Sequence, residues 1–216
     1  MGAGVGAGVG AGIGAGIGGR KRKTTPAGLE AVALDLFDRQ GFAATTVEQI
    51  AAGAGIATRS FFRYFRSKDE VIFGSEAADR EMLLGALAAR PPASLQLADL
   101  EPALLVFADW LDDEHQRDRV LRRAVVVRDN PALWPQMLAV FARWECSLGK
   151  ALAASSGWDA GGGPFEAKVV AAGALAVLMV AVREWCDMAG TPDARPLVDI
   201  VHDAIAVAAP QAAALH

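Results

Sequence analysis

The chain has 216 residues, of which 53% are apolar and 7% aromatic, and a formal net charge of −4. This length allows one small module and one larger helical body, with ample apolar material for a core. The net negative charge argues against a protein that coats nucleic acid or an anionic membrane with its whole surface. Ala, Val and Leu far outnumber the aromatic residues, which favours helices over strands, so we expect an all-α fold.

Charge is unevenly distributed along the chain. Residues 1–73 hold nine Lys and Arg against six Asp and Glu, a net charge of +3. Residues 74–216 hold twelve against nineteen, a net charge of −7. A basic N-terminal part joined to an acidic body is expected when only the N-terminal part meets phosphate.

Three features bear on localisation. Cys146 and Cys186 belong to no CxxC pair, which favours small buried thiols in a reducing compartment over a disulfide or a metal site. The N-terminus lacks the basic start of a secretory signal. The longest uncharged apolar run, Val169 to Val182, is fourteen residues, fewer than the roughly eighteen that a membrane span needs. We therefore expect a cytoplasmic protein with no membrane partner.

The N-terminus is a repeat of Gly-Ala-Gly-Val and Gly-Ala-Gly-Ile units that ends near residue 19. Glycine at every second position makes ordering costly, so we expect a flexible tail; a silk-like cross-β stack is the less favoured alternative. A basic run follows, and by itself it indicates only a solvated arm. If a nucleic-acid reader follows, it becomes a candidate phosphate or minor-groove arm. This run is Arg20, Lys21, Arg22 and Lys23.

A first helix is predicted from Pro26, with Thr25 as its N-cap and Gly41 as its C-terminal residue. Thr45 and Glu48 have the spacing of a capping box, which predicts a short second helix.

A turn at residues 53–55 then leads to a third helix at about residues 57–64. Two short helices joined by a glycine turn and braced by a longer one form a helix-turn-helix.

The rest of the chain also has helical periodicity. A long linker helix is predicted from Ser67 to Arg90, ended by two prolines. Later helices are predicted at about residues 97–113, 115–128, 131–155, 165–189 and 194–209.

Residues 34–72, LDLFDRQGFAATTVEQIAAGAGIATRSFFRYFRSKDEVI, resemble the DNA-binding domain of the TetR family. The shared features are a first helix ending LF…GF, a TT…IA second helix, an AG turn and a recognition helix ending YF.SK. The resemblance implies a tail and arm in residues 1–24, a DNA-binding domain in residues 25–70, and a ligand-binding and dimerisation domain in residues 71–216. It further implies a dimeric regulator, most simply a repressor, on a palindromic double-stranded DNA operator.

The recognition helix of such a domain enters the major groove with its N-terminal residues against base edges. Arg59 is the best candidate for a guanine contact. Ala57 stands where the family often has a capping Ser, which leaves Thr58 as the alternative cap and would remove it from base readout. Phe62 stands where a Tyr often contacts phosphate. Besides the arm, the predicted DNA contacts are Thr46, Thr58, Arg59, Ser60, Arg63, Tyr64 and Lys68.

Large adaptable side chains of the body are candidates for an effector pocket, although plain core is at least as good an interpretation of each. They are Phe107, Trp110, Trp134, Met137, Phe141, Trp144, Met179 and Trp185. The segment LRRAVVVRDNPALWPQMLAVFARWE is similar to mycofactocin-associated regulators, which implies a lipophilic or acyl-coenzyme A effector. Candidates for its anionic end are Arg122, Arg123, Arg128 and Arg143, for each of which surface solvation is the simpler role.

An enzyme and an interaction scaffold are the competing classes. The chain has no GxSxG, HExxH or phosphate-loop motif, and His115 and His202 lie far apart. The run from Asp112 to His115 has metal-binding residue types, but a solvated helix end is the favoured interpretation. We therefore expect no catalytic activity, no cofactor and no metal. A scaffold would differ from a regulator in having no affinity for DNA.

Overall fold

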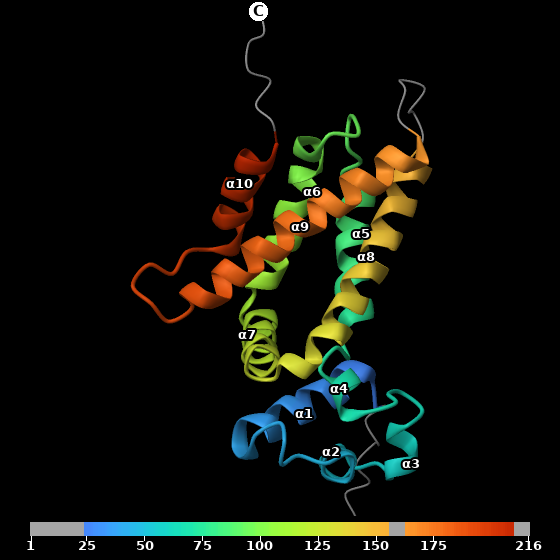
Figure 1. The fold of residues 1–216 in the computed structure, drawn as a ribbon, viewed down its shortest axis with the longest axis vertical. Helices are drawn as coiled ribbons and strands as arrows, with labels where there is room; N and C mark the ends of the chain where they lie inside the picture. The colour runs from blue at the N-terminus through green and yellow to red at the C-terminus, as the bar shows by residue number, and fades with distance from the viewer. Residues whose placement is uncertain (1–23, 156–162, 210–216) are drawn as a thin grey trace, which may run out of the picture.

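The computed structural model describes residues 24–155 and 163–209, and all of its regular elements are helices (Figure 1). The predicted tail and the basic arm, Arg20, Lys21, Arg22 and Lys23, lie outside the described residues. The all-α prediction is confirmed for the described part of the chain. The α-helices are α1 Pro26–Gln40, α2 Val47–Gly53, α3 Thr58–Phe61, α4 Lys68–Val71, α5 Glu76–Ala89, α6 Glu101–Asp112, α7 Glu114–Asp129, α8 Trp134–Ala154, α9 Pro164–Met188 and α10 Leu197–Ala208, and the short 3-10 helices are η1 Leu97–Leu100 and η2 Pro131–Leu133.

The N-terminal domain is the group of helices α1 to α4 at one end of the molecule (Figure 1). Helix α1 begins as the sequence predicts, because the Thr25 side chain accepts a hydrogen bond from the Gly28 amide at 3.0 Å. It ends at Gly41, which has a φ of 83°. Leu29, Ile50 and Phe61 are fully buried where α1, α2 and α3 meet.

The predicted capping box of α2 is wrong by one residue. Thr46 is the N-cap, and the box pairs it with Gln49. Thr45 is buried instead, and its hydroxyl donates to the Gly41 carbonyl at 2.8 Å. Gln40 donates to both Thr45 and Gln49, so the end of α1 selects this register.

The predicted linker helix from Ser67 to Arg90 is also wrong, because the chain turns between α4 and α5. Gly74 packs against the first turn of α1, where an added Cβ would lie 2.4 Å from the Pro26 carbonyl oxygen. The Ser75 amide donates to the Glu30 carboxylate of α1 at 2.8 Å. Contacts with α1 therefore direct the backbone away from one continuous helix. The third helix is shorter than predicted as well, since α3 ends at Phe61 and a turn follows.

The C-terminal domain is a bundle of helices α5 to α10, in which α9 packs on α8 and α10 (Figure 1). Its core includes Phe107 of α6, Leu148 of α8 and Ala171 of α9, all nearly inaccessible to solvent. Helix α7 reaches down from the bundle to pack on α1.

Helix α9 is long and apolar enough to cross a membrane, with an 18-residue window of mean hydropathy 2.0. The uncharged run of fourteen residues therefore understated its apolar length. In the fold, 39% of that window is buried, and Ala167, Ala171, Ala174 and Leu178 form its buried stripe. The opposite side of α9 is exposed.

The prediction that both cysteines are buried is wrong for Cys146 and only partly correct for Cys186. Cys146 is exposed on α8, and Cys186 of α9 is half-buried. Both are free thiols. Burial raises the pKa of the Cys186 thiol to about 11, so at neutral pH this side chain is a protonated, unreactive group.

Candidate DNA-binding and effector sites

The turn between α2 and α3 is fixed by local chemistry. Gly55 has a φ of 68°, which favours glycine, as its sequence position predicts. The Ile56 amide donates to the Ala51 carbonyl at 2.9 Å and closes the turn. Phe61 is fully buried, and its ring lies 5.7 Å from that of Phe65. One side of α3 is thus anchored in the core and the other faces solvent.

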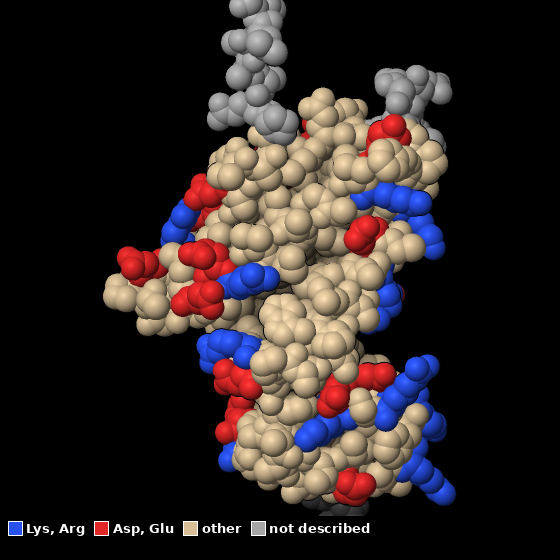
Figure 2. Space-filling view, in the orientation of Figure 1, with Lys and Arg blue, Asp and Glu red and all other residues tan. Residues whose placement is uncertain are grey.

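The predicted base-reading residues Thr58, Arg59 and Arg63, and the predicted phosphate contact Ser60, lie on or beside that solvent side. Arg59 and Arg63 are exposed, and Thr58 and Ser60 are half-buried. Ala57 is the N-cap of α3 and no side chain caps it, so Thr58 does not serve as the alternative cap. Arg59 forms no ion pair with any residue in 24–155 or 163–209. Lys and Arg side chains project from this end of the molecule (Figure 2).

Three predicted phosphate contacts also have structural partners. The Tyr64 hydroxyl donates to the Thr24 carbonyl at 3.0 Å, and the Arg63 guanidinium lies 5.7 Å from the Tyr64 ring centre. The Thr46 hydroxyl accepts from the Gln49 amide at 3.3 Å and remains exposed. Phosphate contacts of these side chains stay predictions.

Lys68 is more fully engaged. Its ammonium group donates to the carbonyls of Phe42, Ala43 and Thr45, at 2.7, 3.3 and 3.0 Å. The same group lies 4.4 Å from the centre of the Phe42 ring. Because an ammonium group has only three N–H donors, all of them are used within the protein. Lys68 therefore ties α4 to the loop between α1 and α2, and its phosphate contact stays a prediction.

Within residues 24–155 and 163–209, the eight candidate effector residues differ widely in burial. Phe107, Trp144 and Trp185 are core side chains, and the Phe107 ring lies 5.6 Å from Trp110 and 5.8 Å from Trp144. Trp134 is 40% exposed at the start of α8. The remaining three, Met137, Phe141 and Met179, are half-buried.

An open pocket of about 560 Å³ lies between α5 and the end of α6. Trp110 is the only predicted effector residue that lines it. The other lining residues are Met82, Val106, Asp109, Asp112 and Asp113. Three carboxylates make this pocket unsuitable for a phosphate-bearing group. The spacing of these aspartates on one helix turn is a sequence signal that our prediction of an apolar pocket left out.

The four candidate arginines for an anionic ligand are already paired with carboxylates. Arg122 of α7 bonds Asp35 and Asp38 of α1, each at 2.7 Å. Arg128 pairs with its neighbour Asp129 at 2.9 Å, and Arg143 lies 3.5 Å from Glu76. Arg123 lies 3.8 Å from Glu30 and 3.6 Å from Asp79. An anionic ligand would have to displace these partners.

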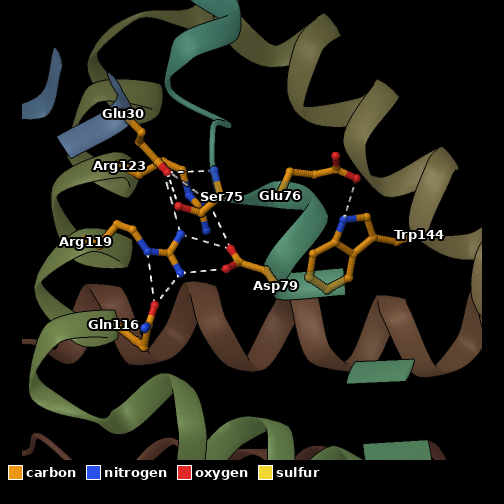
Figure 3. A network of polar contacts seen from close by, with 8 residues as sticks. All are labelled: Glu30, Ser75, Glu76, Asp79, Gln116, Arg119, Arg123 and Trp144. Carbon is orange, nitrogen blue, oxygen red and sulfur yellow. Dashed lines mark hydrogen bonds and ion pairs between the residues drawn. The ribbon is translucent and has the colours of Figure 1, made fainter. Parts of the chain in front are cut away.

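A buried polar network joins the two domains and was not predicted from the sequence (Figure 3). Glu30 of α1 is 0% exposed, and its Oε2 atom accepts hydrogen bonds from both the amide and the hydroxyl of Ser75. Arg119 of α7 donates through two nitrogens to buried Asp79 of α5, each at 2.9 Å. Burial raises the pKa of Glu30 above its ordinary value, while Arg123, Ser75 and Arg119 act to lower it.

Comparison with known proteins identifies the class to which these domains belong. A family model described as "Bacterial regulatory proteins, tetR family" matches residues 30–73, and one described as "MftR C-terminal domain" matches residues 97–212. MftR of Mycobacterium tuberculosis, a proposed regulator of mycofactocin biosynthesis, is 34% identical over 168 residues, which are 77% of this chain and 82% of that protein. The HTH-type transcriptional regulator TcmR of Streptomyces glaucescens is 34% identical over 170 residues, covering 77% and 75%.

The chain therefore belongs to the TetR family of helix-turn-helix transcriptional regulators, which are not enzymes. Within that family, its C-terminal domain is of the MftR type.

Solved structures support the fold. FadR of Bacillus halodurans matches with a TM-score of 0.56 and 14% identity over 90% of this chain and 99% of that one. FadR of Thermus thermophilus, in complex with lauroyl-CoA, matches with a TM-score of 0.53 and 20% identity over 85% and 92%. FadR of Bacillus subtilis, in complex with stearoyl-CoA, has a TM-score of 0.56 and 14% identity over 84% and 96%.

Proposed function

We propose that the protein is a cytoplasmic homodimeric repressor that binds a palindromic operator and is released by a lipophilic or acyl-CoA-type effector. The observation that carries the DNA-binding part is α3, whose buried side is anchored by Phe61 while Arg59 stands exposed and without an ion pair in the described chain. A free guanidinium on a rigid short helix suits the bidentate recognition of guanine.

The exposed side of α9 supports the dimer. Phe165, Val169 and Val180 are 73%, 54% and 56% exposed, and Ala172 and Ala176 lie between them at helical spacing. A row of apolar and small side chains on a long helix lets a second copy approach closely. Val207 of α10, 89% exposed, adds to the apolar surface. We expect two copies of α9 and α10 to form this interface.

The effector part rests on two observations. Two FadR proteins of the same fold are in complex with acyl-CoA molecules. In this chain, the interior between α6 and α8 is aromatic, with Phe107 against Trp110 and Trp144. An acyl chain can be buried there only by moving these rings apart, so binding would separate α6 from α8. The CoA phosphates would lie away from the acidic pocket beside Trp110.

Replacing Arg59 with alanine tests the DNA-binding proposal. We expect operator affinity to fall by about 1 to 3 kcal/mol, with a smaller effect on unrelated DNA, because a base contact is lost. Fluorescence anisotropy with labelled DNA from upstream of the protein's own gene measures both affinities at fixed salt. Arg39→Ala is the matched control, since Arg39 is an exposed arginine of α1 with only a 4.0 Å pair to Asp35. Equal affinity of the unmutated protein for operator and random DNA would contradict the proposal.

Long-chain acyl-CoA is expected to lower operator affinity about 5- to 150-fold, the usual range of allosteric coupling. Linkage then requires operator DNA to weaken acyl-CoA binding by the same factor. Tryptophan quenching with lauroyl-CoA, with and without operator, measures the reciprocal effect, and free coenzyme A is the control ligand. If lauroyl-CoA binds with the same affinity in both conditions, it is not the inducer, and the DNA-binding proposal is unaffected.

A further inference from the structure

The start of α5 and the residue before it contact three other helices through three side chains (Figure 3). Ser75, just before the helix, bonds Glu30 of α1. The Glu76 carboxylate accepts a hydrogen bond from the Trp144 indole N–H of α8 at 3.1 Å. Three residues after Glu76, Asp79 accepts two hydrogen bonds from Arg119 of α7. We call the set Glu30, Ser75, Glu76, Asp79, Arg119 and Trp144 the α5 junction.

We propose that Arg119 exchanges between Asp79 and Glu30 when the effector domain rearranges, and that this exchange sets the position of α1, with Glu30 and Arg119 as the positioning residues. This proposal rests on the proposed function and names the contacts through which effector binding would reach DNA. Its starting point is Trp144, which contacts both Phe107 of the aromatic core and Glu76 of the junction. A ligand that separates Phe107 from Trp144 would pull on Glu76, and Ser75 is its immediate neighbour.

The junction has two available pairings for its buried charges. Arg119 now pairs with Asp79, and Gln116 also accepts hydrogen bonds from its guanidinium. The Glu30 Oε1 atom is buried and has no hydrogen-bond partner among the described residues, yet Nη1 of Arg119 lies only 3.9 Å away.

A small rotation of α7 would therefore bring Arg119 into hydrogen-bonding distance of Glu30 at the expense of Asp79. Two carboxylates on different helices, α1 and α5, compete for one guanidinium. Discrete alternative pairings of this kind give a packed interface two states rather than a continuum.

The neighbouring charges make the exchange possible. Arg123, one turn after Arg119, lies 3.8 Å from Glu30 and 3.6 Å from Asp79, so it remains near whichever carboxylate Arg119 releases. Leaving a buried carboxylate without a cation would be costly. The second arginine reduces that cost in both pairings. The exposed contact of Arg122 with Asp35 and Asp38 keeps α7 near α1 in the same region.

The test is a distance measurement between the domains that needs no effector. Spin labels are placed at Glu48→Cys on α2 and Lys150→Cys on α8, both exposed positions, after Cys146 and Cys186 are replaced by serine. The labelled full-length protein is diluted with unlabelled protein. The two spin labels within one protomer then dominate the signal in pulsed electron–electron double resonance. The unmutated junction is expected to give a narrow distribution.

Two junction variants, one on α1 and one on α7, are compared with one control on α7. Arg119→Lys keeps the charge but cannot hold Asp79 through two nitrogens, and Glu30→Gln keeps the shape but removes the charge. Both variants are expected to broaden or shift the distribution of distances. Both should also bring the factor by which lauroyl-CoA lowers operator affinity closer to 1 than in the unmutated protein. Arg128→Ala, which removes an exposed pair with Asp129, should change neither.

The distance measurement tests the role of the junction, and operator release by lauroyl-CoA tests the proposed effector separately. A purely structural role would lower the midpoint of thermal unfolding while leaving the distance unchanged, and that result in both folded variants would overturn the proposal. Should Arg119→Lys fail to fold by circular dichroism, Glu30→Gln and Ser75→Ala apply the same test, with Ser75→Thr as the variant expected to restore the distance. If lauroyl-CoA does not release operator from the unmutated protein, the effector assignment fails, and the distance measurements still decide the role of the junction.

Discussion

Replacing Lys68 with alanine is expected to destabilise the N-terminal domain by about 2 kcal/mol and, for that reason, to weaken binding to all DNA sequences. The substitution leaves the carbonyls of Phe42, Ala43 and Thr45 without their shared donor. It also removes the cation from the Phe42 ring. The loop between α1 and α2 would then lose its tie to α4. Hydrogen exchange of peptides from residues 41–66, measured by mass spectrometry, reports this loss directly.

A second variant distinguishes this structural role from the predicted phosphate contact. Lys68→Met keeps most of the aliphatic side chain over Phe42 but carries no charge and no donor. If carbonyl binding dominates, hydrogen exchange increases in both variants, and Lys150→Ala, an exposed lysine of α8, serves as the control. If phosphate binding dominates, exchange stays unchanged and the slope of log affinity against log salt falls by about 1. The second result would contradict the structural role.

The parts of the fold that depend on neighbours in sequence could be predicted, and those that depend on distant contacts could not. Thr25, Pro26 and Gly41 bound α1 because capping is local chemistry. The turn between α4 and α5 has no such local signal, because it depends on the packing of Gly74 against Pro26, which lies 48 positions earlier in the chain.

The buried network was missed because periodicity analysis treats a glutamate as a surface residue. The buried positions of α1 are Leu29, Glu30, Ala33, Leu34 and Phe37, so a glutamate lies among the apolar residues of its buried face. A charged residue at the same helical spacing as the buried apolar residues is the signal that would have indicated a buried ion pair. Its partner Arg119 lies 89 positions away, and no sequence pattern connects the two.

The candidate effector residues show a second limit of prediction from sequence. Aromatic and methionine side chains in a helical body serve equally well as core or as pocket lining, and composition cannot separate the two. Here Phe107 and Trp185 are core residues, whereas Trp134 is largely exposed at the start of α8. Which of them a ligand reaches depends on how α6 and α8 can move, and that is a property of packing rather than of sequence pattern.

Replacing Gly74 with alanine is expected to have the largest effect on stability, a loss of about 3 kcal/mol. The new Cβ would lie 2.4 Å from the Pro26 carbonyl oxygen, 2.9 Å from its carbon and 3.0 Å from Cβ of Glu30. The nearest obstacle is backbone in the first turn of α1, so no side-chain rotation relieves the clash, and α1 must move away from α5. For a chain of this size, the thermal midpoint should fall by roughly 6 to 12 °C.

Gly85→Ala, in the middle of α5, is the matched control because an added Cβ there meets nothing within 4 Å. It should raise stability by about 0.5 to 1 kcal/mol through the lower conformational entropy of the unfolded chain. Gly74 lies in the turn before α5 and Gly85 within the helix, but only the Cβ added at Gly74 meets another helix. Circular dichroism melts of both variants therefore compare an alanine that clashes with α1 with one that does not. The Gly74→Ala protein should also lose operator affinity, since Glu30 and Ser75 can no longer keep their hydrogen bond when the two helices separate. A Gly74→Ala variant as stable as the unmutated protein would show that the start of α1 yields easily, and the close contact between α1 and α5 would then not hold the two domains in place.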